Sequence, residues 1–282
     1  MESSNADSVP SQIIEVRPNR RLFNLELGAV WRYRELLYFL IWRDFKVRYK
    51  QAAIGVAWAV VQPVFMVIIF TVVFGNFAKI PSDGIPYPLF AFTALLPWTY
   101  FSEAVRRGSM SLADDSELIR KIYFPRLIIP LAMVVGPMVD FLVSFLVLAA
   151  LLVWYGVMPT WGVVFLPLFV FIALILALAV ALWLGPVNVR FRDIKHTLPL
   201  LLQTWMYASP IVYPLSIVPE QWKLLYSLNP MVGVIEGFRW ALLGTGNPDF
   251  VAMSLSAGFV LLVLLGGIVY FKRMERFFAD VI

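Results

Sequence analysis

Long stretches with almost no charged residues dominate this sequence and limit what it can fold into. The longest covers residues 127–189, where Asp140 is the only charged side chain. A helix needs about 20 apolar residues to cross the hydrocarbon core of a bilayer, so this stretch is long enough for two. The segment GVMPTWG at 156–162 separates them, because Gly and Pro break helices. Charged residues make up 15% of the chain, against about 25% in soluble domains.

The apolar stretches predict an all-α integral membrane protein with six transmembrane helices. A basic, amphipathic interface helix is expected to precede the first span, and two short re-entrant helices are expected between the fifth and sixth spans. The predicted spans are residues 53–75, 84–102, 127–155, 162–185, 197–219 and 250–271. The interface helix covers 30–51 and the outer helix pair 218–244, which makes 30–271 one transmembrane domain between tails 1–29 and 272–282.

The distribution of Lys and Arg gives the expected orientation. Of the 23 Lys and Arg residues, all except Lys79, Lys223 and Arg239 fall on one side of the six-span arrangement. Because cytoplasmic segments of membrane proteins are enriched in Lys and Arg, both termini are predicted to be cytoplasmic. The first 50 residues lack the short apolar core of a cleaved signal peptide. The expected location is therefore a bacterial inner membrane, with targeting by the first span.

Several kinds of chemistry find no support in the sequence. The chain has no Cys and one His, His196, which excludes thiol chemistry and most zinc sites. No G-x-x-x-x-G-K-[ST] phosphate-binding loop occurs, so the chain is not expected to bind ATP. We predict no catalytic, cofactor or metal site. The basic residues of the predicted cytoplasmic segments explain the net charge of +5, so no nucleic-acid partner is predicted either.

The predicted interface helix carries a basic sector. Arg43, Lys46 and Lys50 share this sector, whereas Arg48 and Asp44 lie on the opposite side of the helix. Such a helix can lie at the membrane surface with its long cations reaching lipid headgroups. The alternative is a basic anchor with no further role, since basic residues commonly precede a first span. Both interpretations stay open.

The loop after the second span predicts a short helix at 111–123. Ser111 and Asp114 resemble a capping box. Acidic residues near the start and basic residues near the end suit the helix dipole, and Glu117 and Lys121 are expected to pair at i,i+4. A capped polar helix of this kind can dock on a soluble partner, and the candidate contact residues are Asp115, Glu117, Arg120 and Lys121. The alternatives are a simple connector and, less favoured because capping explains both residues, an acidic metal-binding pair at Asp114 and Asp115.

Asp140 is predicted to lie in the middle of the third span. A carboxylate at such a position costs about 2.5–3.5 kcal/mol on insertion scales. A hydrogen-bonded structural role is favoured over a proton relay, which would need a second buried ionisable group. Glu103 is the nearest candidate for that group, and it has Arg107 at i+4.

Aromatic residues are dense in the predicted spans. Their flat faces suit sugar rings, and the alternative is an aromatic belt at the membrane surface, which explains Trp58 and Trp98 well. The candidate substrate pathway consists of Trp58, Phe65, Trp98, Tyr100, Trp205, Tyr207 and Tyr213. In the outer helix pair, Glu236 and Arg239 are expected to form an ion pair at i,i+3.

Several sequence blocks resemble a known family. They are RDFKVRYKQAAIGVAWAVVQPVF at 43–65, KIYFPRLIIP at 121–130, NVRFRDIKH at 188–196, LLQTWMYASPIVYP at 201–214 and LNPMVGVIEGFRWALLG at 228–244. Together they resemble the membrane permease subunit of ABC exporters for O-antigen, capsular polysaccharide and teichoic acid. The blocks are spread over most of the chain, and none of them identifies one glycan.

This resemblance implies a transport function. Two permease copies would pair with two copies of a separate ATPase subunit, which binds ATP and Mg²⁺, and would export a glycan carried on a polyprenyl diphosphate. The helix at 30–51, with Arg43, Lys46, Arg48 and Lys50, would form the cytoplasmic gate, and the helix at 111–123 the coupling helix. The helix pair at 218–244 would shape the outer exit. The rival hypotheses are a secondary transporter, for which Asp140 is the main support, and an integral-membrane glycosyl or acyl transferase.

Overall fold

The computed structural model describes residues 27–50, 57–191, 193–245 and 250–281. Within these residues every regular element is a helix, and there is no strand. Four helical segments are long and apolar enough to cross a membrane: Trp58–Phe77, Ile128–Trp154, Trp161–Arg190 and Met253–Glu275. Residues 1–26 of the predicted N-terminal tail, residues 53–56 of the first predicted span and Arg192 lie outside the described part.

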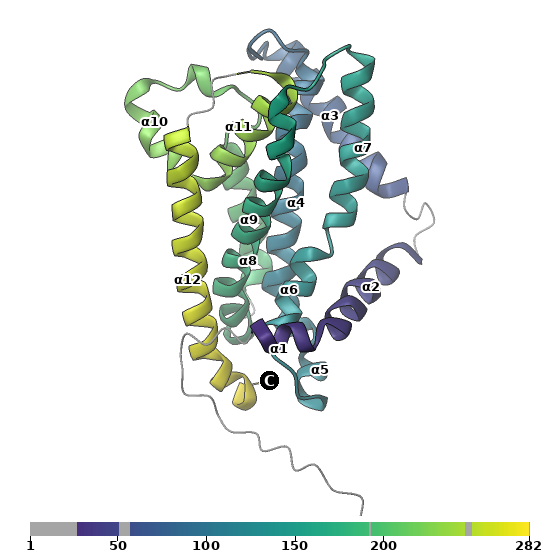
Figure 1. The fold of residues 1–282 in the computed structure, drawn as a ribbon, viewed down its shortest axis with the longest axis vertical. Coiled ribbons are helices and arrows are strands. Elements are labelled where there is room, and N and C mark those ends of the chain that lie inside the picture. The colour runs from purple at the N-terminus through teal and green to yellow at the C-terminus, as the bar shows by residue number, and fades with distance from the viewer. Residues whose placement is uncertain (1–26, 51–56, 192, 246–249, 282) are drawn as a thin grey trace, which may run out of the picture.

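Helix α4 (Tyr87–Asp114) is the centre of the bundle (Figure 1). It packs along α8 (Leu166–Arg190) and also contacts α6 (Ile128–Val135), α7 (Met138–Trp154) and α11 (Pro230–Leu243). The α4–α8 crossing is close: a Cβ atom at Gly108 would lie 2.7 Å from Cβ of Ala181. Glycine is therefore required where these two helices touch.

The central position of α4 explains why it is less apolar than the four candidate spans. Most of its residues are buried against other helices, so its side chains need not be as lipid-soluble as those of a helix at the surface of the bundle. The predicted second span ended at 102, but the helix continues to Asp114 and is about 42 Å long. Residues 111–114 of the predicted coupling helix therefore belong to α4.

Two other predicted spans are interrupted. The segment predicted at 127–155 changes direction between α6 and α7, at Gly136 and Pro137, because proline cannot continue the hydrogen-bonding of a helix. The fifth predicted span, 197–219, is helical only as α9 (Ile194–Tyr207) and then continues without regular helix through 208–214. Pro210 and Pro214 lie in this irregular segment.

Short helices gather at the two ends of the bundle (Figure 1). At one end are α1 (Leu27–Arg32), α2 (Arg34–Lys50), α5 (Ser116–Lys121) and the end of α12 (Phe250–Val281). At the other are α10 (Glu220–Ser227) and the 3₁₀ turns Trp161–Phe165 and Leu215–Ile217. Helix α3 (Trp58–Phe70) continues as a π-helical segment, Thr71–Phe77, along the edge of the bundle.

Candidate functional site

Helix α2 is attached to the bundle by a small apolar cluster. Leu40 is 1% exposed and packs with Phe124, Ile128, Ile129 and Ala132, which lie before and within α6. Burying a leucine side chain contributes about 1.5–3 kcal/mol. One face of α2 is thus held against the bundle, and the polar residues that share this face lie near the polar residues of α4 and α7.

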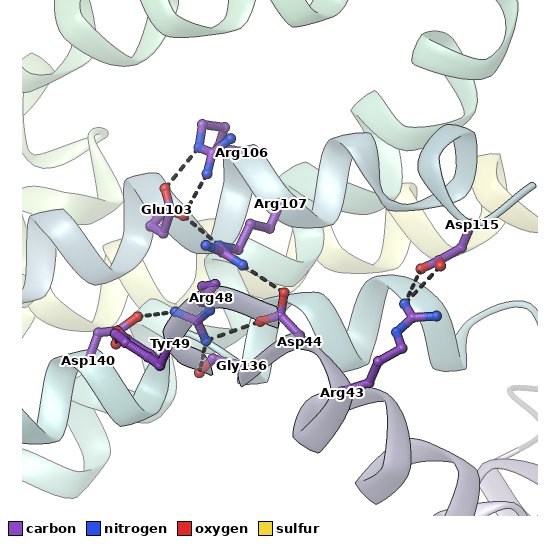
Figure 2. Close-up of polar contacts among 10 residues, drawn as sticks. All are labelled: Arg43, Asp44, Arg48, Tyr49, Glu103, Arg106, Arg107, Asp115, Gly136 and Asp140. Carbon is purple, nitrogen blue, oxygen red and sulfur yellow. Dashed lines mark hydrogen bonds and ion pairs between the residues drawn. The ribbon is translucent and has the colours of Figure 1, made fainter. Parts of the chain in front are cut away.

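A chain of alternating charges continues from this cluster along the inner face of α2 (Figure 2). Its central member is Asp44, whose carboxylate lies 2.8 Å from Arg107 of α4 and 3.0 Å from Arg48 of α2. The Asp44 side chain is 13% exposed. This carboxylate therefore has one guanidinium group on each side. We call this set the ion-pair chain; its members, in order, are Asp140, Arg48, Asp44, Arg107, Glu103 and Arg106.

One end of the ion-pair chain lies at the break between α6 and α7. Arg48 donates to the Asp140 carboxylate and, at 3.3 Å, to the carbonyl of Gly136. Tyr49 donates its hydroxyl to the same carboxylate. The lack of a side chain at Gly136 leaves room for the Asp44 and Arg48 side chains, since a Cβ atom there would be 3.0 Å from Oδ2 of Asp44. The break therefore exposes a backbone acceptor that Arg48 satisfies.

Tyr49 stays a hydrogen-bond donor over the whole physiological pH range. Burial, followed by the hydrogen bond to Asp140, raises the pKa of Tyr49 to about 12. The phenol is thus protonated wherever the protein functions, and Asp140 keeps two donors.

These contacts confirm that Asp140 is hydrogen-bonded, as predicted. Asp140 also lies in the middle of the candidate span Ile128–Trp154, as predicted, and the helix break places it in the first turn of α7. A carboxylate is favoured near a helix N-terminus by the helix dipole.

The other end of the ion-pair chain lies on α4. Glu103 accepts hydrogen bonds from Arg107 at 2.5 Å and from Arg106 at 2.6 and 2.8 Å. Arg106 is the most accessible member, with 42% of its side chain exposed. The ion-pair chain thus runs from a buried helix break to an accessible face of α4, and it ties α2 to both α4 and α7.

A separate ion pair joins α2 to the short helix α5. One guanidinium nitrogen of Arg43 donates hydrogen bonds to both carboxylate oxygens of Asp115, at 2.8 and 2.9 Å (Figure 2). Arg43 was predicted as a gate residue and Asp115 as a coupling residue, and the structure brings them together. A displacement of α5 would therefore be transmitted to α2 through a direct contact.

The remaining predicted residues of these two helices face outward. Lys46 lies over the ring of Trp42, 5.4 Å from its centroid, and Lys50 is exposed. On α5, Glu117 and Lys121 form the expected i,i+4 pair at 2.8 Å with both side chains more than 70% exposed, and Arg120 is exposed. The predicted capping box was wrong: Ser111 lies inside α4 and donates to the carbonyl of Gly108 at 2.7 Å.

Sequence reasoning missed the roles of Asp44 and Tyr49. Asp44 counted as an imperfection of the basic sector, and its partner Arg107 is 63 positions away. The available signal was local: Asp44 and Arg48 are an i,i+4 pair opposite the basic sector. An opposite-charge pair on the less basic side of an interface helix indicates that this side is packed against protein.

The seven predicted pathway aromatics do not form one surface in this structure. Trp58, Phe65 and Tyr207 are exposed. Trp98 and Tyr100 are only 4% and 3% exposed and pack in the hydrophobic core around α4.

The two remaining pathway aromatics are partly buried and hydrogen-bonded. Trp205 packs edge-on against Phe101 and donates to Asn229 at 2.9 Å. Tyr213 is hydrogen-bonded to Tyr226.

Arg239 stabilises the irregular segment at the opposite end of the molecule. The expected pair with Glu236 is confirmed at 2.9 Å, and Arg239 is 2% exposed. It also donates to the carbonyl of Ile211 at 3.1 Å, while Tyr87 donates to that of Val212 at 2.9 Å. Irregular backbone at membrane depth needs such partners inside the protein, so these two side chains account for the turn after α9.

Comparison with known proteins identifies the family. The family model described as ABC-2 type transporter matches residues 35–243. The chain belongs to the ABC-2 type transporter family. The matched region includes every member of the ion-pair chain and all of α5. It also contains the Arg43–Asp115 pair.

Individual relatives are similar to this chain over nearly their whole length. The O-antigen export system permease protein RfbA of Myxococcus xanthus is 32% identical over 252 residues, covering 88% of this chain and 96% of the relative. A protein of the same name from Klebsiella pneumoniae is 27% identical, with 88% and 95% covered. The polysialic acid transport protein KpsM of Escherichia coli is 24% identical, with 84% and 92% covered.

Proposed function

We propose that this ABC-2 type protein is the transmembrane subunit of an ATP-driven exporter that moves a polyprenyl-diphosphate-linked polysaccharide across the bacterial inner membrane. The observation that carries the proposal is the 32% identity to an O-antigen export permease over 96% of that protein's length. The similarity to a polysialic acid transport protein supports the same substrate class. In this proposal the chain itself is not an enzyme, and hydrolysis takes place on a partner subunit.

The proposed assembly contains two copies of this chain and two copies of the ATPase subunit. Each copy would have six spans with both termini in the cytoplasm, α2 at the cytoplasmic membrane surface and α10 with α11 re-entering from the outer side. The gathering of α1, α2 and α5 at the end of the bundle that holds the end of α12 supports this orientation (Figure 1). The exposed charges of α5 would dock on the ATPase subunit.

The contacts within the chain suggest how docking could reach the membrane part. Movement of α5 would pull on Arg43 through Asp115. Helix α2 would carry this movement to the ion-pair chain, which connects it with α4 and with the α6–α7 break. Asp140 and Glu103 both have arginine partners, so we assign them to this connection rather than to proton transfer.

Deletion of the gene in its native bacterium tests the proposed function. The expected result is loss of the surface polysaccharide together with accumulation of the lipid-linked glycan on the cytoplasmic face, both reversed by a plasmid copy. Surface polysaccharide is measured by gel electrophoresis, and intracellular glycan is extracted with the lipid fraction. If the glycan is no longer made at all, the chain acts in synthesis, and the transferase hypothesis replaces this one.

A further inference from the structure

One face of α4 remains open while the rest of the helix is sealed by protein. Residues 89–112 are all described, and every one of them is buried except six. Arg107 is one of the six, and it turns toward Asp44 of α2. The other five are Thr99, Ser102, Glu103, Arg106 and Met110, which we call the open stripe.

The residues of the open stripe lie on a single face of the helix. They recur at steps of three or four positions, which places side chains one above another along an α-helix. Four of the five are polar, and the sequence around them is otherwise apolar or buried. Apart from Arg107, this mainly polar line is the accessible part of α4 between residues 89 and 112.

This polar line begins inside the predicted second span, where lipid would be a poor neighbour. From the start of α4 at Tyr87, Thr99 is about 18 Å and Arg106 about 28 Å along the helix axis. Thr99 and Ser102 lie inside the predicted second span, 84–102, whereas Glu103 and Arg106 follow at its cytoplasmic end, next to Arg107, which contacts α2. The Glu103–Arg106 pair is partly exposed, with 32% and 42% of the two side chains accessible. Polar residues inside a membrane span, and ionisable residues that continue them at its end, usually face a bundle interior or a water-filled cavity.

The lipid-compatible surface of this protein has a different composition. On α3, Gln62 is the one polar residue among the exposed ones, and the others include Val61, Phe65, Met66 and Ile68. Only 11% of that candidate span is buried. The contrast with the open stripe indicates that the two surfaces meet different surroundings.

We propose that the open stripe is a water-wetted wall of the export conduit and binds a polyhydroxylated chain. This inference rests on the proposed function and adds the residues that touch the glycan. The hydroxyl groups of Thr99 and Ser102 donate to helix carbonyls at 3.0 and 3.1 Å, so their oxygens remain available as acceptors. Glu103 adds acceptors and Arg106 adds donors. Sugar hydroxyls can exchange among such groups, whose individually weak binding permits passage.

The absence of cysteine allows a direct accessibility test. Single variants Thr99→Cys, Ser102→Cys and Met110→Cys are compared with Ala104→Cys and Val105→Cys, whose parent residues are 0% exposed. The complete complex with its ATPase subunit is studied in inverted membrane vesicles. The probe is a charged, membrane-impermeant methanethiosulfonate reagent added from the cytoplasmic side. We expect the three stripe positions to react at least tenfold faster than the two buried controls.

A second arm tests whether the glycan occupies this wall. The same variants are labelled in vesicles from cells that make the lipid-linked glycan and from cells that lack its synthesis. We expect loading to slow the reaction at the stripe several-fold and to leave Ala104→Cys and Val105→Cys unchanged. Equally slow labelling at all five positions would overturn the proposal, because lipid or the second copy would then cover the stripe. Fast labelling that glycan does not change would also overturn it.

The outcome is separable from that of the proposed function. If export proved independent of an ATPase subunit, the proposed function would fail, whereas the labelling contrast between stripe and control positions would be unaffected. Conversely, if labelling showed that the open stripe is covered, this inference would fail, whereas export could still depend on ATP hydrolysis.

Discussion

Asp44→Asn is expected to lower the free energy of unfolding by about 1–3 kcal/mol and to reduce export at least tenfold. The carboxylate lies between Arg48 and Arg107 and is 13% exposed. Its neutralisation leaves two guanidinium groups facing each other with one acidic partner fewer. Leaving a buried charged group without its partner costs about this much or more.

The stability change is measured by unfolding the purified protein in detergent micelles, and export is measured as surface polysaccharide at matched abundance. Glu220→Gln is the control, because it removes an ion pair of similar length, 2.5 Å to Lys223, at a position where Glu220 is 87% exposed. An exposed pair contributes only about 0–1 kcal/mol. If both variants lost the same amount of unfolding free energy, the ion-pair chain would not be what holds α2 in place.

Reversing either charge of the Arg43–Asp115 pair is expected to reduce export at least tenfold while the protein still accumulates in the membrane. Arg43→Asp and Asp115→Arg each place like charges at the contact between α2 and α5. The pair is partly exposed, with 36% and 15% of the side chains accessible, so its loss costs only about 1 kcal/mol or less of stability. The Asp115 side chain caps no helix, so its replacement does not remove a cap.

The double variant with Arg43→Asp and Asp115→Arg provides the decisive comparison. It restores opposite charges with the direction of the pair reversed, and we expect it to recover at least half of the normal export. ATP hydrolysis by the complex is measured in parallel, because the single variants should hydrolyse ATP without exporting glycan. Normal export in the single variants would assign α5 the role of a connector, and so would a double variant as poor as the worse single one.

Local patterns in the sequence predicted the local parts of the structure. The predicted break at 156–162 is confirmed, because residues 156–160 form no helix and Gly156 has φ 68°, before a 3₁₀ turn begins at Trp161. The pairs Glu117–Lys121 and Glu236–Arg239 form as their spacing predicted. Each of these features depends on residues within one or two helical turns, where spacing alone determines which side chains meet.

Features that depend on distant segments could not be predicted in the same way. The partners of Asp140 are 91 and 92 positions away, on a helix whose inner face was not recognisable without its neighbours. The extension of α4 to Asp114 follows from its packing along α8, which no local pattern reports. In the sequence, Trp98 and Tyr100 resemble aromatic residues that the structure leaves exposed, such as Phe65, and only the arrangement of helices around α4 buries them.

The central claim is that this ABC-2 type protein moves a lipid-linked polysaccharide with energy from a separate ATPase subunit. It is tested most directly in vesicles reconstituted from the purified chain, its ATPase subunit and the lipid-linked glycan, with the ATPase subunit facing outward. The account predicts that glycan becomes protected inside the vesicles when ATP is hydrolysed, and that vesicles lacking the ATPase subunit protect none. Protection driven by an ion gradient without ATP or the ATPase subunit would contradict the account and identify a secondary transporter.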